Sequence, residues 1–79
     1  MDNEMRNYLK QYGSVQSDEK TWVHPWVTYW RVFGFDHETY IRLDDIIKHL
    51  SERYPAYTFW KGETHISNII YPTIIINKK

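Results

Sequence analysis

The sequence predicts an α+β domain in which two helices pack on a small, mainly antiparallel sheet. Two segments carry apolar residues at helical spacing, whereas the remaining apolar segments are rich in β-branched and aromatic residues. A chain of 79 residues is long enough for one domain, so we expect residues 1–79 to share a single core. The expected order is helix, two strands, helix and then three short strands.

The first helix is expected at residues 3–12. Four of its side chains share one face at three- and four-residue spacing: Met5, Tyr8, Leu9 and Tyr12. Gly13 can end this helix. A helix this short is not stable alone, so its apolar face must pack on the rest of the domain. The polar residues 14–20 are expected to form a loop.

A β-hairpin is expected within residues 26–43. Residues 26–33 are mostly β-branched and aromatic, and residues 39–43 form a second such run after a turn at residues 34–38. Strand alternation would send four side chains into the core: Trp30, Val32, Ile41 and Leu43. It would place three aromatic and two arginine side chains together on the opposite face: Tyr29, Arg31, Phe33, Tyr40 and Arg42.

The second helix is expected at residues 45–53, with Asp44 as its N-cap and Pro55 beyond its end. Its apolar stripe consists of Leu43, Ile46, Ile47, Leu50 and Tyr54. We expect strands at residues 57–60, 64–71 and 73–77, with a turn at residues 61–63. Residues 64–71 also fit a helix, because short apolar runs cannot be assigned by period alone.

The isoleucine run at residues 74–76 is unbroken. Such a run indicates a strand that is buried on both faces or that pairs with a partner chain. The second interpretation allows a homodimer that forms through an edge at Ile74 to Ile76. Size measurement in solution would distinguish the two.

No pattern in the sequence predicts an enzyme active site, a cofactor or a metal site. The chain has no cysteine, its four histidines are widely separated, and three glycines are too few for a phosphate-binding loop. A Gly-x-Ser-x-Gly nucleophile motif is also missing. The Asp44-Asp45 pair is explained by the favourable field at a helix N-terminus.

The composition limits which classes of partner and which cellular compartment we expect for this protein. The net charge is zero, which argues against a DNA mimic and against a strong non-specific DNA binder. No apolar stretch is long enough to span a membrane, and the first ten residues lack the basic and apolar start of a signal peptide. We therefore expect a cytoplasmic protein.

The aromatic and arginine face of the predicted hairpin is the leading candidate for a binding surface, because Tyr and Arg are enriched at binding hot spots. Arg31 and Arg42 would lie opposite each other, which calls for a nearby carboxylate or an anionic partner. The first helix could instead cover this face. Trp22 and Trp60 are the second choice of contact residues.

These patterns indicate a small protein-binding module without enzymatic activity. In composition the chain resembles the small accessory proteins of bacteriophages and mobile elements from AT-rich hosts. That resemblance implies an inhibitor or modulator of a host protein. The alternative is a small nucleic-acid-binding protein. It would either stack single-stranded bases on its aromatic face or, if residues 63–71 were helical, read duplex DNA as a winged helix.

Overall fold

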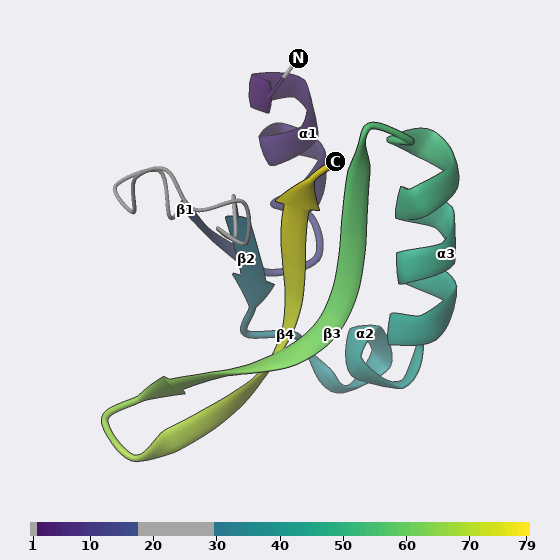
Figure 1. Cartoon of the computed structure of the whole chain (residues 1–79). Helices are drawn as coiled ribbons and strands as arrows, with labels where there is room; N and C mark the ends of the chain where they lie inside the picture. Colours follow the sequence, from purple (N-terminus) through teal and green to yellow (C-terminus); the bar gives the residue numbers. More distant parts are fainter. Residues whose placement is uncertain (1, 18–29) are drawn as a thin grey trace.

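The computed structural model describes residues 2–17 and 30–79 (Figure 1). The described residues form an α+β domain, as the sequence predicts. Its elements follow one another as α1 (Asp2–Leu9), β1 (Ser14–Ser17), β2 (Trp30–Phe33), α2 (His37–Ile41), α3 (Leu43–Arg53), β3 (Tyr57–Ile66) and β4 (Ile69–Lys78).

The four strands form one antiparallel sheet in the order β1-β2-β4-β3. Strand β3 pairs with β4 along its whole length, from Tyr57 opposite Lys78 to Ile66 opposite Ile69. Strand β2 is much shorter and reaches β4 only between Thr73 and Ile76. The β3–β4 hairpin therefore extends beyond the sheet as a two-stranded ribbon (Figure 1).

Two local features shape this ribbon. Its turn consists of Ser67 and Asn68, both with positive φ (49° and 67°), as in the two-residue turns that suit antiparallel hairpins. Within β3, a Cβ on Gly62 would lie 2.2 Å from Cδ1 of Ile75. The absence of a side chain at Gly62 therefore leaves room for the Ile75 side chain to lie across β3, where the ribbon bends away from the sheet. Pro72, in β4, lies just beyond the last residue that β2 reaches.

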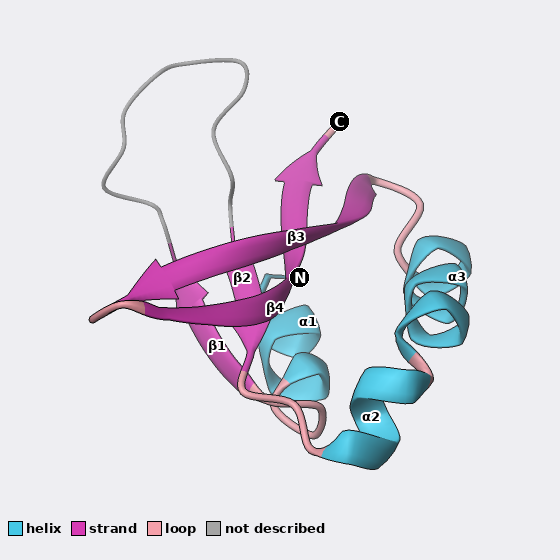
Figure 2. Cartoon of the chain, turned by 90° about the horizontal axis from the view of Figure 1, so that it is seen from below, coloured by secondary structure: helices cyan, strands magenta, loops and turns pink. Residues whose placement is uncertain are grey.

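The core lies between one face of the sheet and the helices (Figure 2). Trp30 and Val32 of β2 lie opposite Ile76 and Ile74 of β4, and all four are buried. The helices cover them with side chains from the predicted apolar stripes: Met5, Leu9, Leu43, Ile46 and Leu50. The inward direction of Trp30 and Val32 and both helical faces are therefore confirmed.

The hairpin predicted at residues 26–43 does not form. Residues 26–29 lie outside the described part of the chain, and residues 37–41 are helix α2 rather than a strand. The carboxylate of Asp36 caps this helix by accepting a hydrogen bond of 2.7 Å from the amide of Thr39. As a result Ile41 is 66% exposed instead of buried.

Strand β2 pairs with segments that the sequence did not suggest as its partners. Residues 14–17 form β1 beside it, so the loop predicted at residues 14–20 is wrong for this stretch, while residues 18–20 lie outside the described part. On its other side β2 meets β4. Both pairings are between distant segments, which local periodicity does not report.

The C-terminal half of the chain also differs from the predicted elements. Helix α3 begins at Leu43, so Asp44 lies in its first turn and is not its N-cap. The turn predicted at residues 61–63 is part of β3, and the strand interpretation of residues 64–71 holds except at the turn. Because β4 has neighbours on both sides, Ile74 to Ile76 are not an edge. Ile74 and Ile76 are buried on the core face, whereas Ile75 on the opposite face is only half-buried, so the prediction of burial on both faces holds for one face.

Candidate functional site

Helix α2 is held in place by its caps and not by burial. None of its residues is buried, Asp36 caps its start, and the amide of Arg42 closes its end on the carbonyls of Thr39 and Tyr40. Tyr40 therefore remains 51% exposed. The hydrogen bond from the Thr39 amide also lowers the pKa of Asp36 below its ordinary value, because it stabilises the carboxylate.

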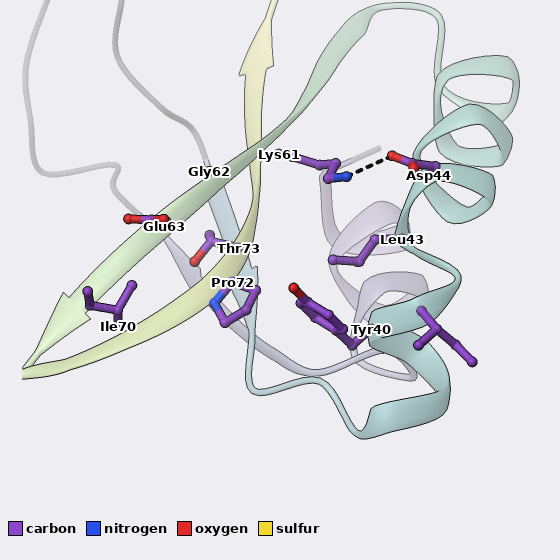
Figure 3. Close-up of a pocket in the computed structure, with 10 residues that line it drawn as sticks. Tyr40, Leu43, Asp44, Lys61, Gly62, Glu63, Ile70, Pro72 and Thr73 are labelled. Atoms are coloured by element: carbon purple, nitrogen blue, oxygen red, sulfur yellow. Dashed lines mark hydrogen bonds and ion pairs between the residues drawn. The ribbon is translucent and has the colours of Figure 1, made fainter.

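A groove of about 610 Å³ separates the α2–α3 corner from the ribbon (Figure 3). One wall comes from the helices and the other from the hairpin. Its lining is formed by Tyr40, Ile41, Leu43, Asp44, Lys61, Gly62, Glu63, Ile70, Pro72 and Thr73. Ile70 is 57% exposed, so both walls offer large apolar side chains to a molecule entering from solvent.

A second hollow of about 350 Å³ continues this groove. Its lining is formed by Gly34, Phe35, Asp36, His37, Tyr40, Tyr71 and Pro72. Tyr40 and Pro72 line both hollows (Figure 3). The two hollows therefore share part of their lining, and we call the surface that they form together the Tyr40 groove.

The groove has buried residues in its lining and charged residues at its rim. Leu43 and Thr73 are buried, and the Thr73 hydroxyl lies 2.7 Å from the Thr64 hydroxyl and 2.9 Å from the Tyr71 carbonyl. At the rim, Lys61 Nζ lies 3.0 Å from Asp44 Oδ1 (Figure 3). Both of these side chains are more than half exposed, so the ion pair adds little to stability.

Among the predicted contact residues within residues 2–17 and 30–79, Tyr40 is the one that lines the groove. Arg31 and Phe33 lie on β2 and point away from the core, as predicted, and the Phe33 ring is 5.6 Å from the Tyr71 ring. Arg42 lies between α2 and α3, beside a separate hollow of about 280 Å³. Arg31 and Arg42 are therefore not opposite each other, and the proposed common face does not exist.

The two tryptophan candidates have different outcomes. Trp60 is 57% exposed on β3, with its indole N–H donating to the Thr58 hydroxyl over 3.2 Å, and it does not line the groove. Trp22 lies outside the described residues, as does Tyr29. Because residues 63–66 are strand, the winged-helix alternative lacks its second helix.

The contribution of the ribbon to the site does not follow from the sequence-based predictions. They place Ile41 in the core and give no contact role to Ile70 or Pro72, all three of which line the groove. One signal could have revealed the ribbon. Ser67 and Asn68 separate two β-branched runs by two residues, and asparagine tolerates the positive φ that such a hairpin turn requires.

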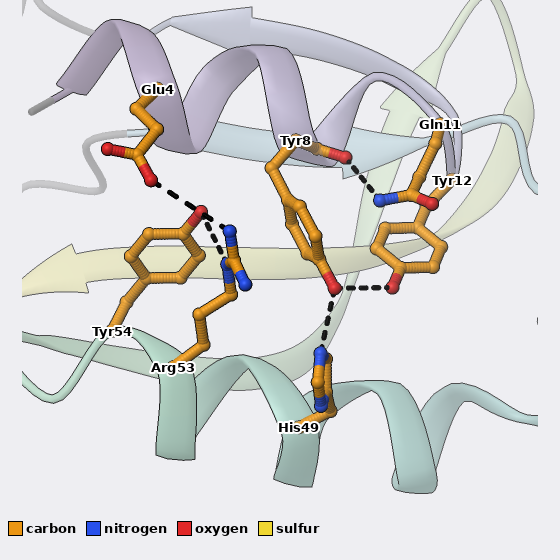
Figure 4. A network of polar contacts seen from close by, with 7 residues as sticks. All are labelled: Glu4, Tyr8, Gln11, Tyr12, His49, Arg53 and Tyr54. Atoms are coloured by element: carbon orange, nitrogen blue, oxygen red, sulfur yellow. Dashed lines mark hydrogen bonds and ion pairs between the residues drawn. The ribbon is translucent and has the colours of Figure 1, made fainter.

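A second cluster joins α1 to α3 (Figure 4). The Tyr8 hydroxyl lies 2.8 Å from Nε2 of His49 and 3.3 Å from the Tyr12 hydroxyl. The Arg53 guanidinium lies 4.4 Å from the centre of the Tyr8 ring, and its Nε donates to the Tyr54 hydroxyl over 3.1 Å. These contacts fasten the first helix to the third, and we assign the cluster a structural role.

This cluster makes stability depend on pH in the alkaline range. Burial and the hydrogen bond with Tyr8 raise the pKa of Tyr12 from 10.0 to about 12. Between these values the folded chain keeps a proton that the unfolded chain loses, so the free energy of unfolding is expected to decrease as the pH rises from 10 to 12. Urea unfolding across this range measures the decrease.

A Tyr12→Phe variant is the control for this measurement. It removes the titrating hydroxyl, so its free energy of unfolding should decrease less steeply over the same pH range. An equally steep decrease in both proteins would show that another group is responsible.

Among residues 2–17 and 30–79, no three His, Cys, Asp or Glu side chains gather as a metal-binding group. Within the same residues, no helix combines the length and the apolar character needed to cross a membrane. Comparison of the chain with protein-family models, curated proteins and solved structures gives no match.

Proposed function

We propose that this chain is a small, non-enzymatic protein-binding module whose contact surface is the Tyr40 groove. In this proposal it acts in the cytoplasm as an inhibitor or modulator of a host protein, in the manner of phage and mobile-element accessory proteins. The observation that carries the proposal is the lining of one groove by three large apolar side chains that are each more than half exposed: Tyr40, Ile41 and Ile70.

Exposed apolar side chains that converge on a concave surface are typical of interaction sites. Each square ångström of apolar surface that a partner covers favours binding by about 25 cal/mol, before the entropic and desolvation costs of association are subtracted. The buried Leu43 and Thr73 give this surface a fixed base, so little ordering is needed on binding. Tyrosine is also among the residues that most often dominate binding energy.

Paired variants test the surface without disturbing the core. Tyr40→Ala with Ile70→Ala removes one exposed apolar side chain from each wall of the groove. The matched control is Trp60→Ala with Ile69→Ala, which removes two side chains of similar exposure that do not line it. Since all four are more than half exposed, both variants should fold as the wild type does.

The measurement is quantitative partner capture with the full chain, followed by affinity measurement on the captured protein. We expect the groove variant to lose at least about tenfold in affinity, or roughly 1.4 kcal/mol, while the control variant stays close to wild type. Equal retention by all three proteins contradicts the assigned surface. Retention of oligonucleotides that weakens steeply with salt would instead support the nucleic-acid alternative.

A further inference from the structure

The charged groups around the Tyr40 groove are unequal in sign. Three carboxylates line its two hollows, those of Asp36, Asp44 and Glu63. The opposing ammonium group is that of Lys61, and it already lies 3.0 Å from Asp44. Asp36 and Glu63 therefore leave negative charge in the smaller and the larger hollow, respectively.

Both of these carboxylates can meet a ligand. Asp36 is exposed, and the hydrogen bond to its side chain from Thr39 keeps its pKa low, so it remains ionised in mildly acidic as well as neutral solution. Glu63 has a side chain that is 64% exposed, and its neighbour His65, at 3.4 Å, offsets its charge only when the imidazole is protonated. At neutral pH the rim of the groove is therefore acidic.

One aromatic side chain, that of Tyr40, lines both of the hollows that hold these two carboxylates. Tyr40 follows Asp36 by one helical turn, with its amide donating to the Asp36 carbonyl over 2.9 Å, and both residues line the smaller hollow. A planar cation can stack on such a ring and also reach a carboxylate with two N–H groups. Apolar walls on either side leave room for neighbouring uncharged side chains.

We infer that the Tyr40 groove takes a segment of a partner protein in which arginine alternates with apolar side chains. This inference rests on the proposed function and specifies the partner of the same site. Arginine is favoured over lysine because its guanidinium both stacks and forms bidentate pairs. Phosphate-rich nucleic acids, anionic membranes and acidic peptides would meet like charge at this rim.

A charge-neutralising pair of substitutions tests the inference. Asp36→Asn keeps a residue that caps helices as well as aspartate does, and Glu63→Gln keeps the length of the side chain. The control is Asp45→Asn with Glu52→Gln, which changes the net charge equally at exposed positions of α3 that do not line the groove. A difference between the two variants then reports the local and not the overall charge.

The probe is a display library of short random peptides selected on the full chain, followed by synthetic copies of the selected peptides. We expect selection of peptides that combine arginine with apolar residues, and a five- to tenfold weaker Kd when arginine is replaced by glutamine. The Asp36→Asn/Glu63→Gln variant should lose about the same factor, while the control variant should not. Selection of acidic or uncharged peptides, or of none, would overturn the inference.

The groove variant Tyr40→Ala/Ile70→Ala separates this inference from the proposed function. If that variant loses the captured partner but Asp36→Asn/Glu63→Gln keeps it with unchanged affinity, the binding surface stands and the arginine assignment is wrong. If neither variant loses the partner, the proposed surface itself is wrong. Loss of binding in both variants, with the two controls unaffected, supports both statements.

Discussion

Replacing Ile74 with alanine is expected to lower the free energy of unfolding by about 2–4 kcal/mol. Ile74 is 0% exposed and lies at the centre of the sheet, opposite Val32 on one side and Lys61 on the other. The variant would leave a cavity that rigid strands on both sides cannot close. For a domain of this size such a loss is a large part of the total stability.

Ile69→Ala is the matched control because it removes the same atoms from the same strand. Ile69 is 52% exposed beside the turn of the ribbon, so its loss should change the free energy of unfolding by less than about 0.5 kcal/mol. Urea denaturation of both variants, followed by tryptophan fluorescence, gives the comparison. Similar losses in the two would mean that β4 is not an interior strand of the sheet.

A Gly13→Ala substitution is expected to cost about 1–3 kcal/mol of stability, through a clash with the backbone. A Cβ on residue 13 would lie 2.4 Å from the carbonyl oxygen of Phe33 and 3.2 Å from its carbonyl carbon. Neither atom can rotate away, so the connection between α1 and β1 must shift relative to the end of β2. Glycine is therefore required here by close approach of two chain segments, and not only as the end of a helix.

Gly62→Ala provides the comparison for this prediction. Its Cβ would meet Ile75, but the nearest atom is the end of a side chain that can adopt another rotamer. We expect a smaller loss than at Gly13, measured by thermal unfolding of both variants. A larger loss of stability at Gly62 would contradict this prediction. It would show that the bend of the ribbon is more sensitive to substitution than the α1–β1 connection.

The parts of the fold that sequence predicted correctly depend on local spacing. Met5 and Leu9 of α1, and Ile46 and Leu50 of α3, lie on the core faces that their three- and four-residue spacing indicates. The end of α3 before Pro55 also followed from a local rule. Such signals are contained in about ten consecutive residues, so one sequence is enough to read them.

The errors concern pairings between distant segments and one short helix. Nothing local indicates that β2 pairs with residues 14–17 and 73–76 instead of with residues 39–43. The aromatic and β-branched content of residues 39–43 predicts a strand. In the structure, residues 37–41 form a helix whose first turn is capped by the Asp36 carboxylate. For a run of five residues, one capping hydrogen bond can outweigh intrinsic preference.

The candidate site was predictable only in part for the same reason. The sequence predicts Tyr40 as a contact residue, but it places this residue on a strand beside Arg31. Its actual neighbours, Ile70 and Pro72, are about thirty residues away in the sequence and reach it through the ribbon. A groove made by two distant elements becomes visible when the topology is known.

Pro72 has a consequence for how this protein can associate with other chains. Between Ile69 and Pro72, the edge of β4 that faces away from β3 has no neighbouring strand in the described structure. An unpaired edge of this kind can pair with a strand of another chain. Because proline has no amide hydrogen, Pro72 cannot donate a backbone hydrogen bond to such a strand. A proline at this position therefore disfavours the addition of a strand along this edge.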